Sequence, residues 1–162
     1  MSTTTGTGHR FRDTRVRIYQ FADQALVRCP ACGGCATVLA QLGEPEVRRL
    51  RQGGLVTRRR LRCGACGLAK DRFQNWSCFG GPVDPYFRLP LWLQADCRGE
   101  LLWALNREHL DYLESYVSAR LREHEPGHFT LSLVARLPRW LTSAKNRDEV
   151  LRVLGRLRAT LP

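Results

Sequence analysis

Two short cysteine motifs constrain the fold of this chain more than any other feature of its sequence. Cys29-Pro-Ala-Cys32-Gly and Cys63-Gly-Ala-Cys66-Gly share one pattern, in which two cysteines stand three residues apart and glycine follows the second. A tight turn at this spacing lets both thiolates face one ion, and the glycine can adopt the left-handed backbone that the turn needs. Together the motifs offer four sulfurs, which is enough to close a tetrahedral zinc site with a structural role.

The paired motifs resemble the zinc ribbon, as found in ribbons of the transcription factor IIB type, over roughly residues 15–73. This resemblance implies that Cys29, Cys32, Cys63 and Cys66 bind one structural Zn²⁺ ion. The C-terminal part, from Asn106 to Leu154, is similar to that of an uncharacterised bacterial zinc-ribbon protein. The 30 residues between the two motifs exceed the ~15 to 20 that are common in such sites, so we expect an enlarged arm between the two turns.

Two other interpretations of the first motif fit the sequence less well. Cys29, Cys32 and Cys35 match the start of an iron–sulfur ligand run, but the fourth cysteine of the ferredoxin pattern is missing. A thioredoxin-like redox pair would require a helix that begins at its first cysteine. Gly33-Gly34 directly after the motif argues against such a helix.

The remaining cysteines leave an alternative open. Cys35, Cys78 and Cys97 lack the spacing of a metal-binding turn, although they could meet each other or His109 to form a second metal site. The other interpretation is that all three are small, partly buried thiols.

The net charge of +11 is concentrated in the first part of the chain, where residues 1–66 hold 12 Arg and 4 acidic residues. On a strand, Arg58, Arg60 and Arg62 would share one face at ~6.6 Å intervals and could reach successive phosphates of DNA or RNA. The same residues could dock on an acidic protein surface, or simply form a solvated basic surface. The candidate binding residues are Arg48, Arg49, Arg51, Arg58, Arg59, Arg60 and Arg62.

Other patterns favour a cytoplasmic protein that is not an enzyme. No segment approaches the ~20 apolar residues of a membrane helix, and the first residues lack the apolar stretch of a signal peptide. In a reducing compartment, C-x-x-C pairs are typical of metal ligands rather than disulfides. The chain has no Gly-rich phosphate loop and no hydrolase or metalloprotease motif. We therefore expect no catalytic residues, no small-molecule substrate and no membrane partner.

The pattern as a whole predicts an α+β fold, with zinc-ribbon β-hairpins, an antiparallel aromatic hairpin and two or three C-terminal helices. We expect a disordered tail over 1–10, the ribbon with its basic arm over 11–75, and the hairpin plus helices, packed on the ribbon, over 76–162. The aromatic residues from Phe73 to Trp103 are interleaved with leucines, which favours core packing over a stacking platform for bases. The expected strands are 15–21, 25–28, 36–42, 55–62, 68–73, 91–95 and 100–105.

Two or three helices complete the prediction. Asn106 is the expected N-cap of a helix whose apolar residues run to Leu121 and which ends near 125–127. The segment 129–141 fits two structures: its first apolar residues alternate as in a strand, whereas Leu133 and Leu137 fit a helix that Pro138 would kink or end, and the helix is favoured. A third begins after Ser143 as N-cap. Its apolar stripe is formed by Val150, Leu154, Leu157 and Leu161.

Overall fold

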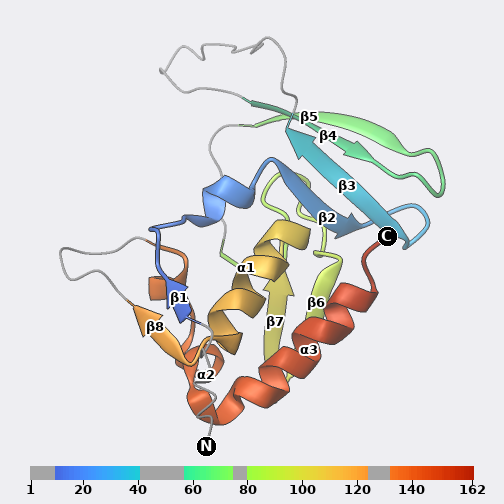
Figure 1. The fold of residues 1–162 in the computed structure, drawn as a ribbon. Coiled ribbons are helices and arrows are strands. Elements are labelled where there is room, and N and C mark those ends of the chain that lie inside the picture. Colours follow the sequence, from blue (N-terminus) through green and yellow to red (C-terminus); the bar gives the residue numbers. More distant parts are fainter. Residues whose placement is uncertain (1–9, 41–56, 75–79, 124–131) are drawn as a thin grey trace, which may run out of the picture.

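The chain combines a four-stranded antiparallel sheet with a second unit of helices and a β-hairpin, as Figure 1 shows. The computed structural model describes residues 10–40, 57–74, 80–123 and 132–162. The predicted α+β fold is confirmed. Of the predicted tail, only Arg10 lies within the described residues, where it begins a short strand.

The four-stranded sheet forms from two hairpins. Its strands are β2 (Gln24–Arg28), β3 (Cys35–Ala40), β4 (Thr57–Arg62) and β5 (Ala69–Gln74), in that order across the sheet. The central pair is antiparallel, and Val38 of β3 lies opposite Leu61 of β4. The described parts of the four strands predicted here are therefore confirmed, and their ends within the described residues differ from the prediction by at most one residue.

One face of this sheet is apolar because small and branched residues alternate along its strands. The buried members are Ala25, Val27, Ala36, Val38 and Leu61, each at most 5% exposed. They pack against Tyr86, Leu91 and Leu105 from the segment that follows the sheet. This face therefore joins the four-stranded sheet to the rest of the chain.

A second core lies between the other hairpin and two helices. It is built by β6 (Leu93–Cys97), β7 (Glu100–Ala104), α1 (Arg107–Ser118) and α3 (Arg147–Ala159). Figure 1 shows α1 and α3 beside this hairpin. The predicted hairpin is confirmed, and so is Asn106 as the N-cap of α1, whose side chain accepts from the His109 N–H at 2.9 Å.

The end of α1 was predicted too late. The helix stops at Ser118, because Ala119 takes an extended conformation. Leu121, expected on its apolar stripe, instead begins β8 (Leu121–Glu123), which pairs in parallel with β1 (Arg10–Arg12). A strand partner from the distant N-terminal segment thus replaces the last helical turn.

The strand predicted over 15–21 is wrong. Its second half forms a 3₁₀ helix, η1 (Ile18–Phe21). Arg15 has a φ of +61°, which interrupts the extended backbone. The Arg17 N–H then donates to Oε1 of Gln20 at 2.6 Å, and the Gln20 N–H donates back to the Arg17 carbonyl at 3.0 Å. These local hydrogen bonds take the place of a strand partner.

The helices after residue 131 also differ from the prediction. Instead of one helix up to Leu141, the described part has η2 (Val134–Arg136) and α2 (Arg139–Thr142), separated at Pro138. Ser143 does not cap α3, because η3 (Ala144–Asn146) intervenes. The predicted stripe of α3 is buried at Val150, Leu154 and Leu157, while Leu161 lies past the end of the helix and is half-buried.

The aromatic side chains of the central segment mostly pack in the two cores, as predicted. Tyr86 is buried, and Phe87, Trp92 and Trp103 are half-buried against core residues. Phe73 is the exception among the described residues, with 46% of its surface exposed, while Trp76 and Phe79 lie outside them. None of the described helices is both long enough and apolar enough to cross a membrane.

His109 gives the stability of the fold a pH dependence that can be measured. The side chain is 2% exposed, and burial lowers its pKa from 6.5 to about 4. The unfolded chain therefore binds the proton first, so the free energy of unfolding falls as the pH drops from 6.5 towards 4, by about 3 kcal/mol in all. Urea unfolding measures the free energy of unfolding of the wild type and of His109→Gln. The advantage of the wild type over the variant should shrink between pH 7 and pH 4, because the variant has no imidazole to protonate. A constant difference across this pH range would contradict the assignment.

Candidate metal centre

The pairing of the strands brings the two cysteine motifs to the same end of the sheet. Cys29 follows β2 and Cys63 follows β4, so each motif forms the turn of one hairpin. Because β3 and β4 pair antiparallel, with Thr37 opposite Arg62, both turns lie at one end of the β3–β4 ladder. The sequence spacing creates the turns, and the sheet register then places them together.

The four sulfurs have the spacing of a metal site. Their Sγ atoms all lie within 4.8 Å of one another. Sγ of Cys29 is 3.7 Å from that of Cys66, and Sγ of Cys32 is 3.6 Å from that of Cys63. A tetrahedral ion with ~2.3 Å bonds to sulfur separates its ligands by about 3.8 Å, whereas a disulfide bond is only ~2.05 Å long. The four cysteines are thus placed to coordinate a single metal ion.

The two turns have the same backbone structure. The Gly33 N–H donates to the Cys29 carbonyl at 2.9 Å, and the Gly67 N–H donates to the Cys63 carbonyl at 3.0 Å. The two glycines have φ angles of +73° and +76°, a conformation that side chains disfavour. This explains why glycine follows the second cysteine in both motifs.

Burial divides the four ligands into two pairs. Cys29 and Cys63 are 3% exposed and belong to the core on the apolar face of the sheet. Cys32 and Cys66 lie in the exposed part of each turn. An ion bound here would be covered by the core on one side and accessible to a chelator on the other.

The pKa values of the four thiols depend on one another because the sulfurs lie so close together. Burial raises the pKa of Cys29, but backbone N–H groups of Cys32 and Ala31 outweigh it and bring the pKa down to about 6. The Leu68 N–H lowers the pKa of Cys66, yet burial and the other three thiols raise it to about 12. Four neighbouring sulfurs therefore cannot all ionise at neutral pH unless a metal ion compensates their charge.

Four cysteines at metal-binding distance on two antiparallel hairpins define a protein with a metal-binding site compatible with a zinc ribbon. Comparison with protein-family models, with curated proteins and with solved structures finds no match to this chain. The metal centre therefore rests on its own geometry.

The alternative second metal site does not form among the described residues, where the four-cysteine group is the one cluster of potential ligands. Cys35 is half-buried beside the sheet, and Cys97 is 1% exposed within β6. His109 uses its Nδ1 atom to accept from the Leu105 N–H at 3.1 Å. Cys78 lies outside the described residues.

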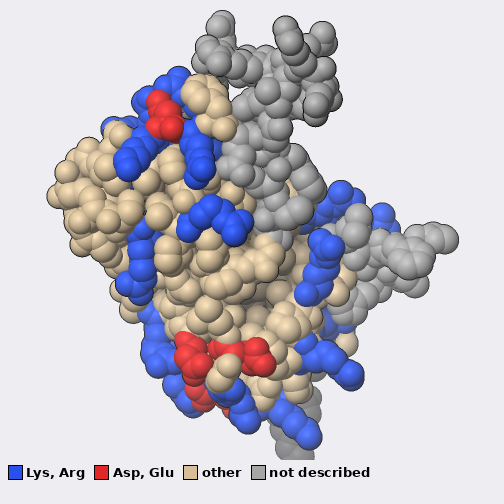
Figure 2. Space-filling model, turned by 180° about the vertical axis from the view of Figure 1, so that it is seen from behind, with Lys and Arg blue, Asp and Glu red and all other residues tan. Residues whose placement is uncertain are grey.

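Three of the candidate binding arginines lie on the outer face of β4, as the strand alternation predicted. Arg58 and Arg60 both pair with Asp71, which stands opposite Arg60 on β5. These two guanidinium groups, that of Arg60 foremost, hold the pKa of Asp71 well below its usual range. Arg62 is exposed and has no ion pair among the described residues. Figure 2 shows basic side chains grouped around an acidic one at the end of the molecule formed by β4 and β5.

Arg59 occupies a different position from the other arginines of β4. It is 8% exposed and faces the apolar side of the sheet. Its Nη1 atom donates to the Ala22 carbonyl at 2.7 Å, and its guanidinium lies 4.2 Å from the centre of the Tyr86 ring. Arg59 thus packs the four-stranded sheet against the segments that contain Ala22 and Tyr86. The candidates Arg48, Arg49 and Arg51 lie outside the described residues.

Phe73 is a candidate site residue that the sequence prediction missed. It lies directly opposite Arg58 in the β4–β5 register, with its ring centre 5.8 Å from the guanidinium carbon. The outer face therefore presents an exposed aromatic ring beside basic side chains. The alternation of β5 could have placed Phe73 on the face of Asp71, but the register with β4 comes only from the folded chain.

Proposed function

We propose that this chain is a structural zinc module that binds the backbone of DNA or RNA through the outer face of β4 and β5. The observation that carries the zinc assignment is the tetrahedral spacing of the Sγ atoms of Cys29, Cys32, Cys63 and Cys66. Four thiolates select zinc among common divalent ions, and four protein ligands leave no coordination position for a substrate. The proposed zinc ion fastens the two hairpins, and the module acts in the cytoplasm as an adapter or regulator.

The composition of the outer face supports a nucleic-acid partner. Arg58, Arg60 and Arg62 follow one another on the same face of β4, and Phe73 extends that face on β5. Arginines can reach successive phosphates, while an exposed ring can stack on an unpaired base. This combination favours single-stranded DNA or RNA, and it predicts binding that tolerates many sequences and weakens in salt.

One observation favours a second candidate, docking on an acidic protein surface. Asp71 neutralises part of the charge of Arg58 and Arg60, and the half-buried Leu39 lies opposite Arg60 on β3. A face that mixes apolar and charged groups is typical of protein interfaces. The partner would then belong to a transcription, replication or other multiprotein assembly.

The salt dependence of binding distinguishes the two candidates. Fluorescence anisotropy with a mixed-sequence single strand of about 20 nucleotides should show affinity that falls steeply between about 50 and about 200 mM salt. Arg62→Ala together with Phe73→Ala should weaken binding at least about tenfold, because a phosphate contact and a stacked base are lost. Arg120→Ala, an exposed change far from the sheet in sequence, is the matched control. An affinity for the single strand that does not change with salt, or that is the same in the wild type and all variants, would favour protein docking instead.

A further inference from the structure

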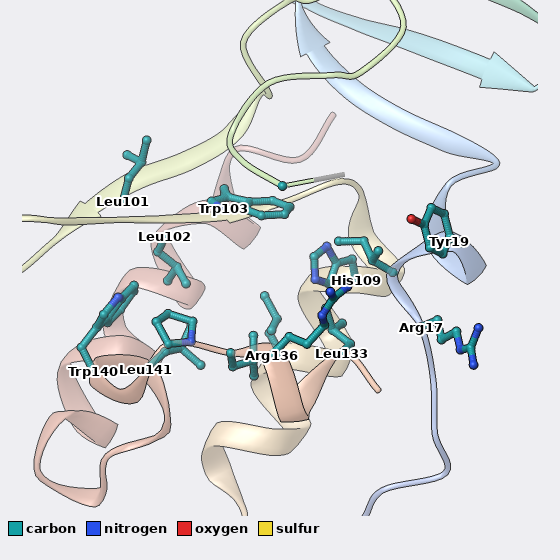
Figure 3. Close-up of a pocket in the computed structure, with 15 residues that line it drawn as sticks. Arg17, Tyr19, Leu101, Leu102, Trp103, His109, Leu133, Arg136, Trp140 and Leu141 are labelled. Atoms are coloured by element: carbon teal, nitrogen blue, oxygen red, sulfur yellow. The ribbon is translucent and has the colours of Figure 1, made fainter. Parts of the chain in front are cut away.

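A cavity of about 450 Å³ opens between η1, β7, α1 and the segment from residue 133 to residue 141. Figure 3 shows the residues that line it. Its volume falls in the range of ~300 to 1,000 Å³ that is typical of small-molecule sites. None of its lining residues comes from the four-stranded sheet, so the cavity is separate from the metal centre and from the proposed nucleic-acid face.

The walls of the cavity are apolar and partly aromatic. Trp103 of β7 and Trp140 of α2 line it, and Figure 3 shows their indole rings on different parts of the wall. Leu102, Leu113 and Leu141 fill the space around them. Indole and leucine side chains fit a flat hydrocarbon body, because they offer large contact surfaces and lose few rotamers on binding.

A buried polar group lies in this apolar wall. His109 lines the cavity and is 2% exposed. Its Nδ1 atom accepts from the Leu105 N–H, so Nε2 carries the proton and is a donor. One ring face stacks on Phe21 with 5.2 Å between centres. Nε2 has no acceptor in the part of the chain that the structure describes. This donor is not one of the fully buried side-chain atoms that lack a partner, so it is accessible from the cavity, where an acceptor atom of a ligand can reach it.

The charges around the cavity indicate that this acceptor is anionic. Arg17 and Arg136 line the cavity and are exposed, while none of the described lining residues is acidic. Figure 3 shows the Arg136 side chain running toward His109, whereas Arg17 extends away from it. Figure 2, seen from behind Figure 1, shows a hollowed surface with basic side chains beside it and a group of acidic side chains below it. A neutral N–H donor and a guanidinium that line the same cavity can together bind the two oxygens of one carboxylate.

We propose that this cavity binds a small aromatic carboxylate. The ring of the ligand packs against Trp103 and Trp140. One carboxylate oxygen accepts from Nε2 of His109, and the other pairs with Arg136. The cavity would let a small molecule bind to the protein at a site that shares no residue with the metal centre.

Isothermal titration calorimetry on the metal-loaded full chain tests this assignment with two probes of equal size, 2-naphthoate and 2-naphthalenemethanol. We expect 2-naphthoate to bind at one site, at least about tenfold more tightly than the alcohol, because only the carboxylate pairs with Arg136. Arg136→Ala should abolish most of this preference. Arg139→Ala, which removes an exposed arginine three residues away and outside the cavity lining, should leave it unchanged.

His109→Phe provides a second variant, which keeps a ring against Phe21 but removes the donor. It should weaken the binding of 2-naphthoate while the far-UV circular dichroism spectrum of the chain stays unchanged. Equal affinity of the wild type for both probes would overturn the proposal, and so would equal losses in Arg136→Ala and Arg139→Ala. Absence of saturable 2-naphthoate binding to the wild type would also overturn it, without bearing on the zinc ion or on nucleic-acid binding.

Discussion

Replacing Cys29 and Cys66 by serine is expected to release the metal and to unfold most of the four-stranded sheet, while α1 and α3 remain helical. Cys29 and Cys63 are part of the core on the apolar face of the sheet, whereas the helices pack in the other core. Structural zinc contributes about 10 kcal/mol or more to the folding of zinc-finger peptides, so we expect the sheet to lose at least about 3 kcal/mol. Hydrogen exchange should show lost protection of amides in β3 and β4 and retained protection in α1.

The matched control is Cys35→Ser, because Cys35 lies next to the site in sequence but outside the four-sulfur group. This variant should keep its metal and its exchange pattern. Loss of protection in α1 and β4 together after the double substitution would show that the two cores do not unfold separately. Unchanged metal content in the double variant would contradict the ligand assignment.

Arg59→Ala is expected to destabilise the protein by roughly 3 kcal/mol, the size of effect seen when a buried charged group loses its partner. The substitution removes the hydrogen bond to the Ala22 carbonyl and the contact with the Tyr86 ring. It also affects Asp84, which is fully buried: burial raises the pKa of this carboxyl, and the positive charge of Arg59 counteracts part of the rise. Urea unfolding of the metal-loaded chain measures the change.

Arg62→Ala is the comparison for this prediction, since the same residue type on the same strand faces outward. We expect it to change the free energy of unfolding by no more than about 0.5 kcal/mol. The affinity for nucleic acid should show the reverse order. At temperatures where both variants are folded, Arg62→Ala should bind nucleic acid more weakly than the wild type, and Arg59→Ala should bind it as well as the wild type. Similar stability of the two variants would mean that the buried contacts of Arg59 contribute little.

The sequence was most informative where structure depends on neighbouring residues. The two C-x-x-C-G motifs specify their own turns, because two ligands and a left-handed glycine lie within five residues. The strands beside them alternate clearly, and Asn106 caps α1 through a bond that spans three residues. The four-cysteine cluster and most of the four-stranded sheet could therefore be predicted.

Features that depend on distant partners could not be predicted in the same way. The arginines at 58, 59, 60 and 62 cannot be told apart by residue type. Only the fold places the Tyr86 ring against Arg59 and pairs Asp71 with both Arg58 and Arg60. The end of α1 depends on pairing with β1, more than 100 residues earlier in the chain. The cavity collects residues from η1, β7, α1 and α2, and no local pattern connects these elements.

Metal analysis of the purified chain, combined with X-ray absorption at the zinc edge, tests the central claim most directly. We predict one zinc ion per chain, surrounded by four sulfurs at ~2.3 Å with no nitrogen or oxygen ligand. Fewer than about 0.5 zinc per chain, or a first shell that contains nitrogen or oxygen, would contradict a closed site formed by Cys29, Cys32, Cys63 and Cys66.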